Sequence, residues 1–227
     1  MCCLPALGQW HTFPGTSLLG ARLLHMTLRQ IADRAFEVPL VYRSLQAPFA
    51  EKKLAPFLRD FRQGPAKSIL DVGCGPGTNA RHFRNARYTG IDLNPDYIAS
   101  AQRRFAGRFL VGDVTDASVF PAERFDCVLV NSLMHHLDDE AVRGLLSRLP
   151  RVVAPGGHMY ILDLVMPLTL NAAWMFARLD RGRHARSITA WRVLFSASFS
   201  IETFVEFPLG FAGLELWRMV YCKGKPR

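Results

Sequence analysis

Short apolar runs alternate with polar and glycine-rich stretches through the middle of the chain, and this alternation predicts an α/β fold. The run Ser68–Val72 is apolar apart from Ser68 and Asp71, and a glycine-rich turn follows it. Ala80–Arg84 can then continue as a helix, which gives a strand, a turn and a helix in sequence. That order is typical of the beginning of a βαβ unit.

Later apolar runs predict further strands and helices of the same layered fold. The predicted strands are Tyr88–Asp92, Phe125–Asn131, Tyr160–Leu164, Phe199–Phe207 and Leu214–Cys222. Turn-forming residues in Phe207–Gly213 join the last two strands. Asn94 and Pro95 can cap and open a helix, and Leu168–Leu179 and Ile188–Ala197 predict two more.

The chain before the glycine-rich turn predicts a different organisation. We expect residues 1–25 to be a mobile leader, because they fit neither a signal peptide nor a span long enough to cross a bilayer. Residues 26–63 predict an N-terminal helical cap, cut into two or three pieces at its prolines. Those prolines are Pro39, Pro48 and Pro56. Residues 64–227 are expected to form the main domain, with a helical lid insertion at about 165–187.

The spacing of the glycines indicates which class of nucleotide the turn binds. Glycines at 73, 75 and 77 let the backbone take positive φ angles and approach a ligand closely. A dinucleotide fingerprint needs its third glycine where Thr78 stands, so the pattern is Asp-x-Gly-x-Gly-x-Gly instead. Asp92 follows about 20 residues after the turn, where a carboxylate can bind a ribose diol in either class of protein.

With this motif and those that follow it in order, the chain from about Lys67 to Lys223 resembles the class I methyltransferases that use S-adenosylmethionine. The resembling segments are Asp71–Gly77, Asp92, Val111–Val114, Phe125–Asn131 and Val153–Ile161. The resemblance implies a doubly wound, Rossmann-like sheet of seven strands, mostly parallel with an antiparallel C-terminal hairpin and helices on both faces. A nicotinamide-binding Rossmann domain is the alternative fold.

The resemblance also implies which residues hold the cofactor S-adenosyl-L-methionine. Leu93 is expected beside the adenine, Asp113 and Val114 at its polar edge, and Asn131 and Ser132 in the channel to the acceptor. Asp113 can also cap a helix near Ala117. The full set of expected cofactor-binding residues is Asp71, Gly73, Cys74, Gly75, Gly77, Thr78, Asn79, Asp92, Leu93, Asp113, Val114, Asn131 and Ser132.

Candidate catalytic side chains follow from the chemistry that such a cofactor brings. A sulfonium methyl group is already activated, so the protein mainly positions donor and acceptor and excludes water. If the acceptor needs a base, His135, His136 and Tyr42 are the candidates, with Asp163 a lesser one. Two adjacent histidines cannot share a helical face, so we expect at most one of them in the site.

We expect no metal site in this sequence. His135, His136 and Asp138 lack the spacing that places two ligands on one face of a helix. The five cysteines, at positions 2, 3, 74, 127 and 222, contain no C-x-x-C pair. We therefore expect reduced thiols in a reducing, cytoplasmic compartment.

The composition of the chain, and above all its positive charge, allows several classes of acceptor and does not select one of them. The chain has 227 residues, 49% of them hydrophobic, and a formal net charge of +9. This charge permits nucleic acid, anionic lipid or an acidic small molecule as partner. Arginines gather between residues 178 and 192, at positions 178, 181, 183, 186 and 192, either as a solvated face or as a rim that attracts anions.

Three functions remain open from the sequence. The first is a methyltransferase for a small, largely apolar acceptor, such as a biosynthetic intermediate. The second is a methyltransferase for nucleic acid or lipid, although the chain has no Asn-Pro-Pro-Tyr type sequence after the predicted fourth strand and nucleic acid is not favoured. The third is a non-catalytic, cofactor-binding partner subunit. The apolar lid helix fits a cover over the acceptor, a contact with a membrane surface or a second subunit, and the oligomeric state stays open.

Overall fold

The computed structural model describes the backbone of residues 39–62, 67–180 and 182–227, and the side chains of 49–61, 67–180 and 182–227. The predicted leader, residues 1–25, and the side chain of Tyr42 lie outside the described residues. Our predictions for them stay untested.

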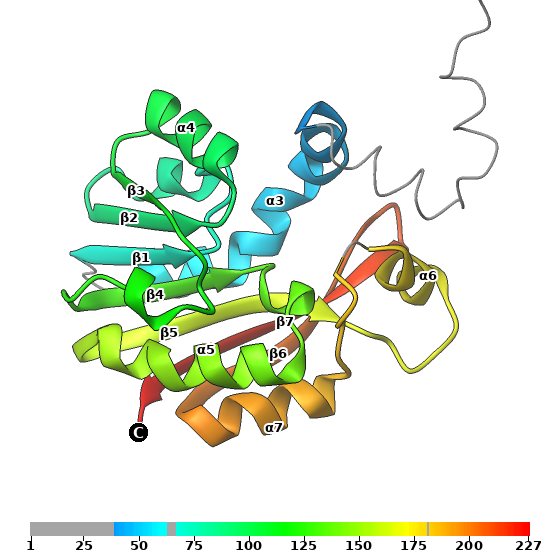
Figure 1. The fold of residues 1–227 in the computed structure, drawn as a ribbon. Coiled ribbons are helices and arrows are strands. Elements are labelled where there is room, and N and C mark those ends of the chain that lie inside the picture. Colours follow the sequence, from blue (N-terminus) through cyan, green and yellow to red (C-terminus); the bar gives the residue numbers. More distant parts are fainter. Residues whose placement is uncertain (1–38, 63–66, 181) are drawn as a thin grey trace, which may run out of the picture.

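A single seven-stranded sheet organises the chain, with strand order β3-β2-β1-β4-β5-β7-β6 (Figure 1). Its strands are β1 (Ser68–Val72), β2 (Arg87–Asp92), β3 (Arg108–Val111), β4 (Phe125–Asn131), β5 (Val153–Val165), β6 (Phe199–Phe211) and β7 (Leu214–Pro226). The pairs from β3 to β5 are parallel, whereas β7 is antiparallel to both β5 and β6. The predicted fold class is confirmed. Strand order reverses between β1 and β4, which is where ligands bind in open α/β sheets.

Helices cover both faces of the sheet (Figure 1). They are α3 (Pro39–Arg62), α4 (Pro95–Arg104), α5 (Asp139–Val152), α6 (Ala172–Leu179) and α7 (Ile188–Ser198). One core unites α3 and α4 with one face of the sheet, and a second core unites α5 and α7 with the other face. No described helix has the length and apolar composition that crossing a lipid bilayer requires.

The prediction that prolines cut the N-terminal segment into pieces was wrong for residues 39–62. Helix α3 (Pro39–Arg62) runs without a break through Pro48 and Pro56. Each internal proline removes one hydrogen bond of the helix. Leu54 and Phe57 are almost completely buried against the sheet, and this packing offsets the loss.

The prediction that the chain continues as an ordinary helix through Ala80–Arg84, after the glycine-rich turn, was also wrong. Residues Thr78–His82 form a short 3₁₀ helix instead of an α-helix. Strand β2 already begins at Arg87, so the chain has no room for several α-helical turns. A 3₁₀ turn reaches the buried position of Phe83 within that length.

The C-terminal hairpin is longer than its sequence indicated. The segment that we expected as a loop, 207–213, is mostly strand, and only Ala212 and Gly213 turn the chain, with φ of 49° and 78°. Pro208 is tolerated because β6 is an edge strand. The extension places the pair Leu209 of β6 and Trp217 of β7 beyond the end of β5, whose last pair with β7 joins Val165 to Arg218.

The lid contains a shorter helix than its apolar pattern predicted. Helix α6 begins only at Ala172, because the side chain of Asn171 accepts a hydrogen bond from the N–H of Trp174 and caps the helix there. Phe176 of α6 packs against Trp217 of β7, with ring centroids 5.4 Å apart. The lid and the hairpin therefore lie side by side (Figure 1).

Cysteines in the described chain are buried free thiols, as the sequence predicted. Cys74, Cys127 and Cys222 form no disulfide. Burial raises the pKa of Cys222 to about 12, and it raises the pKa values of the other two thiols as well. These groups are therefore uncharged core residues at neutral pH, and the thiol of Cys74 donates to the carbonyl of Gly75 in the glycine-rich turn, at 3.5 Å.

Candidate functional site

The glycine-rich turn is closed by backbone hydrogen bonds and leaves one glycine facing open space. The N–H groups of Gly73 and Cys74 both donate to the carbonyl of Ile91, at 2.8 and 2.9 Å. A Cβ on Gly73 would meet Leu133, and one on Gly77 would meet Ala101, whereas a Cβ on Gly75 would meet nothing within 4 Å. Gly75 is therefore the position that leaves room for a ligand, and the other two glycines serve packing.

Asp92 holds this turn in place and ends β2 at the same edge of the sheet. Its carboxylate accepts hydrogen bonds from the N–H of Gly75 at 2.8 Å and from the N–H of Asn94 at 2.9 Å. Asn94 in turn caps α4, as the sequence predicted. One carboxylate thus links the turn to the start of the next helix, and Asp92 stays partly exposed.

Asp71 is a buried carboxylate, and only one of its two oxygens has a hydrogen-bond partner among the described residues. One oxygen accepts hydrogen bonds from the hydroxyl of Tyr88 and from the side-chain amide of Asn79, which lies 2.9 Å away. The other oxygen, Oδ1, is buried and has no hydrogen-bond partner among the described residues. Burial raises the pKa of Asp71 to about 6, against the opposing effect of these two donors. An ammonium group or another donor at this place would satisfy Oδ1.

The remaining residues expected at the nucleoside end lie in different surroundings. Leu93 is 66% exposed at the end of β2, which suits a residue that a ligand would cover. Asp113 is exposed, and its carboxylate accepts from the N–H and the hydroxyl of Thr115. Val114 is buried in the core. The cap of the turn at Ala117–Val119 is Asp116, so the capping role considered for Asp113 was wrong.

A pocket lies beside the glycine-rich turn, between α3, the lid and the C-terminal hairpin. Its polar lining comes from Lys53, Ser132, His135, His136 and Asp180. Its apolar lining is Phe49, Ala50, Leu164, Leu209, Trp217 and Met219. Ser132 and His135 were expected near an acceptor, and the structure brings them together here. Asn131 stays at the end of β4, with its side-chain oxygen 3.4 Å from the hydroxyl of Ser132.

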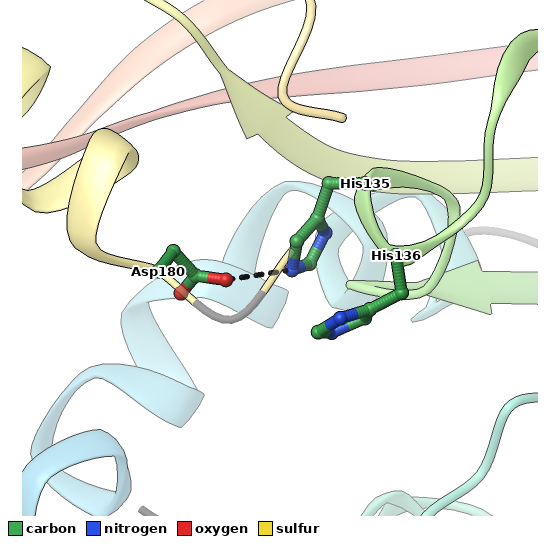
Figure 2. A group of neighbouring side chains, drawn as sticks. All are labelled: His135, His136 and Asp180. Atoms are coloured by element: carbon green, nitrogen blue, oxygen red, sulfur yellow. Dashed lines mark ion pairs between the residues drawn. The ribbon is translucent and has the colours of Figure 1, made fainter. Parts of the chain in front are cut away.

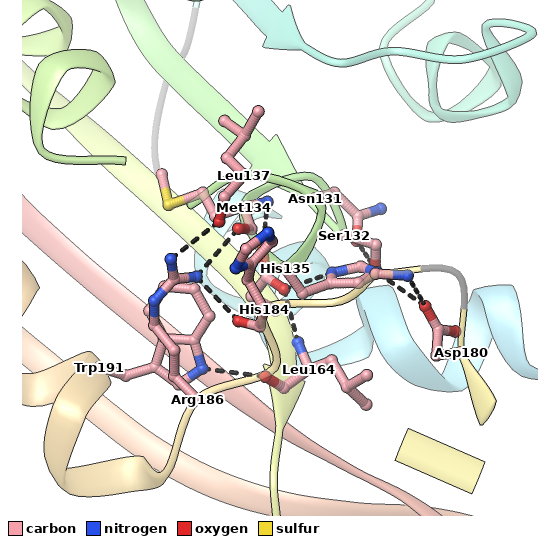
Figure 3. Close-up of polar contacts among 12 residues, drawn as sticks. Asn131, Ser132, Met134, His135, Leu137, Leu164, Asp180, His184, Arg186 and Trp191 are labelled. Atoms are coloured by element: carbon pink, nitrogen blue, oxygen red, sulfur yellow. Dashed lines mark hydrogen bonds and ion pairs between the residues drawn. The ribbon is translucent and has the colours of Figure 1, made fainter. Parts of the chain in front are cut away.

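His135 is buried between two carboxylates, and Figure 3 shows the one that comes from the lid, Asp180. Its Nδ1 lies 2.6 Å from Asp163 of β5, and its Nε2 lies 3.3 Å from Asp180 of the lid. Burial alone lowers the pKa of His135, but the charge and hydrogen bond of Asp163, together with Asp180, raise it to about 9. His135 therefore carries a proton on both nitrogens at neutral pH, and in this form it cannot accept a further proton.

Asp163 has a larger role than the turn cap that the sequence left open. It is fully buried and accepts hydrogen bonds from the N–H groups of Met134 and Leu164, at 2.8 and 2.7 Å, as well as from His135. Despite its burial, these partners hold the pKa of Asp163 below its usual range. It therefore fixes both the position of the His135 turn and the orientation of the ring.

Both histidines of the pair line the pocket, so the expectation that at most one would do so was wrong. Successive residues of the 3₁₀ turn Met134–His136 point about 120° apart, but the turn lies at the wall of the pocket, and both side chains contribute to its lining. The ring centroids of His135 and His136 are 4.1 Å apart. His136 is exposed, whereas His135 is buried.

Lys53 is a pocket residue that sequence analysis missed. Its ammonium group donates to the hydroxyl of Ser132 at 2.9 Å, across a sequence separation of 79 residues. Desolvation lowers the pKa of Lys53, and the charges of Asp163, Asp180 and Asp71 partly oppose this shift. Within the described chain Lys53 forms no ion pair. The only signal in the sequence was a lysine in the predicted cap.

Arg186 joins the end of the lid by hydrogen bonds to the turn that carries His135 and His136 (Figure 3). Its guanidinium group donates to the carbonyls of Met134 and Leu137, at 3.0 and 2.8 Å, and pairs with Asp139 at 2.7 Å. Arg186 is itself 8% exposed. This side chain was singled out in the sequence only as one of a cluster of arginines, so its place in a buried network is a result of the tertiary structure.

Gly182 brings the lid backbone against His135. A Cβ at this position would lie 1.9 Å from a ring carbon of His135, so the approach requires glycine. The N–H of Gly182 donates to Asp180, and the N–H of His184 donates to the carbonyl of His135. These contacts of the lid hold Asp180 and the ring of His135 in fixed positions relative to each other.

A family model described as a methyltransferase domain matches residues 69–157. The matched range begins in β1 and ends in β5. It contains the glycine-rich turn, Asp92 and the His135–His136 turn. It leaves out Lys53, the lid and the hairpin, which are the parts that complete the pocket.

Relatives share the same central part of the chain. An uncharacterized methyltransferase of Mycobacterium tuberculosis (strain H37Rv) is 39% identical over 111 residues, which cover 47% of this chain and 55% of that protein. A fatty-acid O-methyltransferase of Mycolicibacterium smegmatis is 41% identical over 104 residues, covering 43% of this chain and 37% of that protein. The chain thus spans about half or less of the length of these relatives.

Solved structures agree over a longer stretch. The N-methyltransferase NodS of Bradyrhizobium japonicum, in complex with S-adenosyl-L-homocysteine, superposes with a TM-score of 0.66 and 20% identity. The match covers 87% of this chain and 97% of that protein. At this identity the likeness concerns the fold. Residues 69–157 are a methyltransferase domain, and the chain around them has the class I S-adenosylmethionine-dependent methyltransferase fold.

Proposed function

We propose that this chain is an S-adenosylmethionine-dependent methyltransferase whose acceptor is the carboxylate of a small, largely apolar acid. The cofactor part of the proposal is supported by three features of the glycine-rich side. Gly75 leaves open space, Asp92 is partly exposed beside it, and Asp71 has a buried oxygen without a partner in the described chain. These residues fit the amino-acid and ribose ends of the cofactor, which when bound supplies an activated methyl group.

The acceptor part is supported by the charge of the pocket. Lys53 presents an ammonium group there, whereas both ring nitrogens of His135 already face the carboxylates of Asp163 and Asp180. The buried groups described at this site thus provide donors for an anion and no free base for removing a proton. A carboxylate reaches the pocket already deprotonated, so it needs no base.

Lys53 is the single observation that carries the choice of a carboxylate. Its ammonium group is desolvated, and the hydrogen bond that it donates within the described chain goes to a neutral hydroxyl. An incoming carboxylate would supply the opposite charge and offset that desolvation. Phe49, Leu209 and Trp217 line the same pocket and would contact an apolar tail. The fatty-acid O-methyltransferase of M. smegmatis is a relative whose name agrees with this acceptor class.

The experiment compares Lys53→Met with Lys52→Met on a panel of fatty acids, a phenol and a primary amine. Lys52 is exposed and is hydrogen-bonded only to the carbonyl of Gly210 in the described chain, so it is the matched control. We expect methyl esters from the acids alone. For Lys53→Met we expect a rise of about tenfold or more in KM, because a charge-assisted bond of about 1.5–3 kcal/mol is lost.

Two results would contradict the proposal. Transfer to the phenol or the amine in preference to every acid would overturn the carboxylate. Binding of S-adenosyl-L-homocysteine without turnover of any acceptor would instead favour the cofactor-binding subunit considered from the sequence. Calorimetry with S-adenosyl-L-homocysteine on the same samples separates these outcomes from simple loss of the cofactor site.

A further inference from the structure

We infer that His135, His136 and Asp180 form a binding site for a divalent transition-metal ion at the wall of the pocket. One nitrogen of each histidine and one carboxylate oxygen of Asp180 lie within 4.8 Å of one another (Figure 2). The sequence pattern did not predict this group. The acid considered there, Asp138, caps α5 through the N–H of Ala141, and the acid that joins the histidines comes from the lid.

The distance between two of the ligand atoms already suits a metal ion. Ligand atoms held about 2.1 Å from a tetrahedral zinc ion are about 3.4 Å apart. Nε2 of His135 and Oδ1 of Asp180 are 3.3 Å apart. His136 follows on the same short turn, its ring centroid 4.1 Å from that of His135, and one of its nitrogens already belongs to the group of ligand atoms within 4.8 Å of one another.

The second nitrogen of His135 is arranged as in known metal sites. A histidine that binds a metal through one ring nitrogen usually donates its other N–H to a carboxylate. Nδ1 of His135 lies 2.6 Å from the buried carboxylate of Asp163, which leaves Nε2 on the side of Asp180 and the pocket. Gly182 packs its backbone on the same ring, and its N–H holds Asp180.

Two imidazoles and one carboxylate favour zinc or ferrous iron over magnesium or calcium. Three protein ligands also leave a coordination position open, and all three residues line the pocket. A metal ion would replace the proton that His135 and Asp180 otherwise share, and its positive charge would face the carboxylates of Asp180 and Asp163 in place of the imidazolium charge. This geometry supports a metal ion whether or not the proposed methyl transfer takes place.

The test uses the full chain and Zn²⁺ alone, measured by calorimetry, with Co²⁺ as a spectroscopic probe of the ligands. We expect one ion per chain, a visible Co²⁺ spectrum of nitrogen and oxygen ligands, and loss of both in His136→Ala and Asp180→Asn. Asp163→Asn should weaken binding by about 10- to 100-fold, because it removes the partner that orients His135. The expected fall is larger for the two ligand variants.

His158→Ala is the matched control, since His158 also lies near a carboxylate, 3.1 Å from Glu202, but has no second histidine beside it in the described chain. It should leave Zn²⁺ binding unchanged. His136 is exposed, so His136→Ala should keep the thermal unfolding midpoint of the wild type. Wild-type affinity for Zn²⁺ in His136→Ala and Asp180→Asn, or no binding by the wild-type chain, would overturn the inference. Binding of S-adenosyl-L-homocysteine to the same variants is measured in parallel, so loss of the cofactor site is recognised separately.

Discussion

The glycine-rich side of the crevice and the pocket beside it are built by different means. On the glycine-rich side, Asn79 binds Asp71 across 8 residues of sequence, and Gly75 binds Asp92 across 17. In the pocket, Lys53 binds Ser132 across 79 residues, and Arg186 reaches Met134 across 52. The first side is one local unit of strand and turn, whereas the second is assembled from segments that meet only in the folded chain.

On the proposed function, this difference separates the region that would bind the cofactor from the region that would select the acceptor. The local unit lies inside the matched methyltransferase domain, and the lid, the hairpin and α3 lie outside it. A substitution in one region should therefore leave the other region intact. Variants in each region test that independence, beginning with the largest expected effect.

Replacing Arg186 by Met should damage the pocket and spare the glycine-rich side. The buried carbonyls of Met134 and Leu137 would lose their donor, and Asp139 would lose its partner. We expect a loss of about 3–5 kcal/mol in the free energy of unfolding, measured with urea, and loss of acceptor turnover. Affinity for S-adenosyl-L-homocysteine should persist at temperatures where the variant is folded.

Arg183→Met is the control for this prediction, because Arg183 is exposed and belongs to the same cluster of arginines. It should unfold like the wild type. If Arg186→Met removed cofactor binding while the chain remained folded, the two regions would not be independent.

Replacing Asp92 by Ala should have the reverse selectivity. The variant loses the carboxylate that fixes the N–H groups of Gly75 and Asn94 and that we propose for the ribose. We expect affinity for S-adenosyl-L-homocysteine to fall by on the order of 2 kcal/mol or more, which is about thirtyfold in Kd. Calorimetry measures this, with the exposed Asp96→Ala as control. Wild-type affinity in Asp92→Ala would remove Asp92 from the site.

The smallest expected effect comes from replacing either of two glycines that both have a left-handed backbone conformation. Gly75 and Gly156 both have positive φ, of 54° and 78°, and a Cβ at either position would have no neighbour within 4 Å. Substitution by Ala should cost each about 1–2 kcal/mol of stability through left-handed strain. Only Gly75→Ala should also weaken binding of S-adenosyl-L-homocysteine, because Gly75 lies at the crevice. Equal affinity in both variants would show that the space beside Gly75 is not used by the ligand.

The sequence by itself determined the sheet, the glycine-rich turn and the carboxylate that follows it at the end of β2. Strand periodicity, glycine spacing and the carboxylate after β2 are local properties, and local hydrogen bonds such as that of Asn94 with α4 express them directly. Even here the detail differed. The chain after the turn became a 3₁₀ helix, because the distance to β2 leaves no room for more.

Only the tertiary structure decided the pocket. Nothing near Lys53, Asp180 or Arg186 in the sequence marks them as neighbours of the His135 turn, and packing of α3, the lid and the hairpin brings them there. The protonation of His135 also depends on this assembly, since two carboxylates from different elements surround its ring. Burial and charge are set by distances between distant segments, and a linear pattern of residue types does not contain those distances.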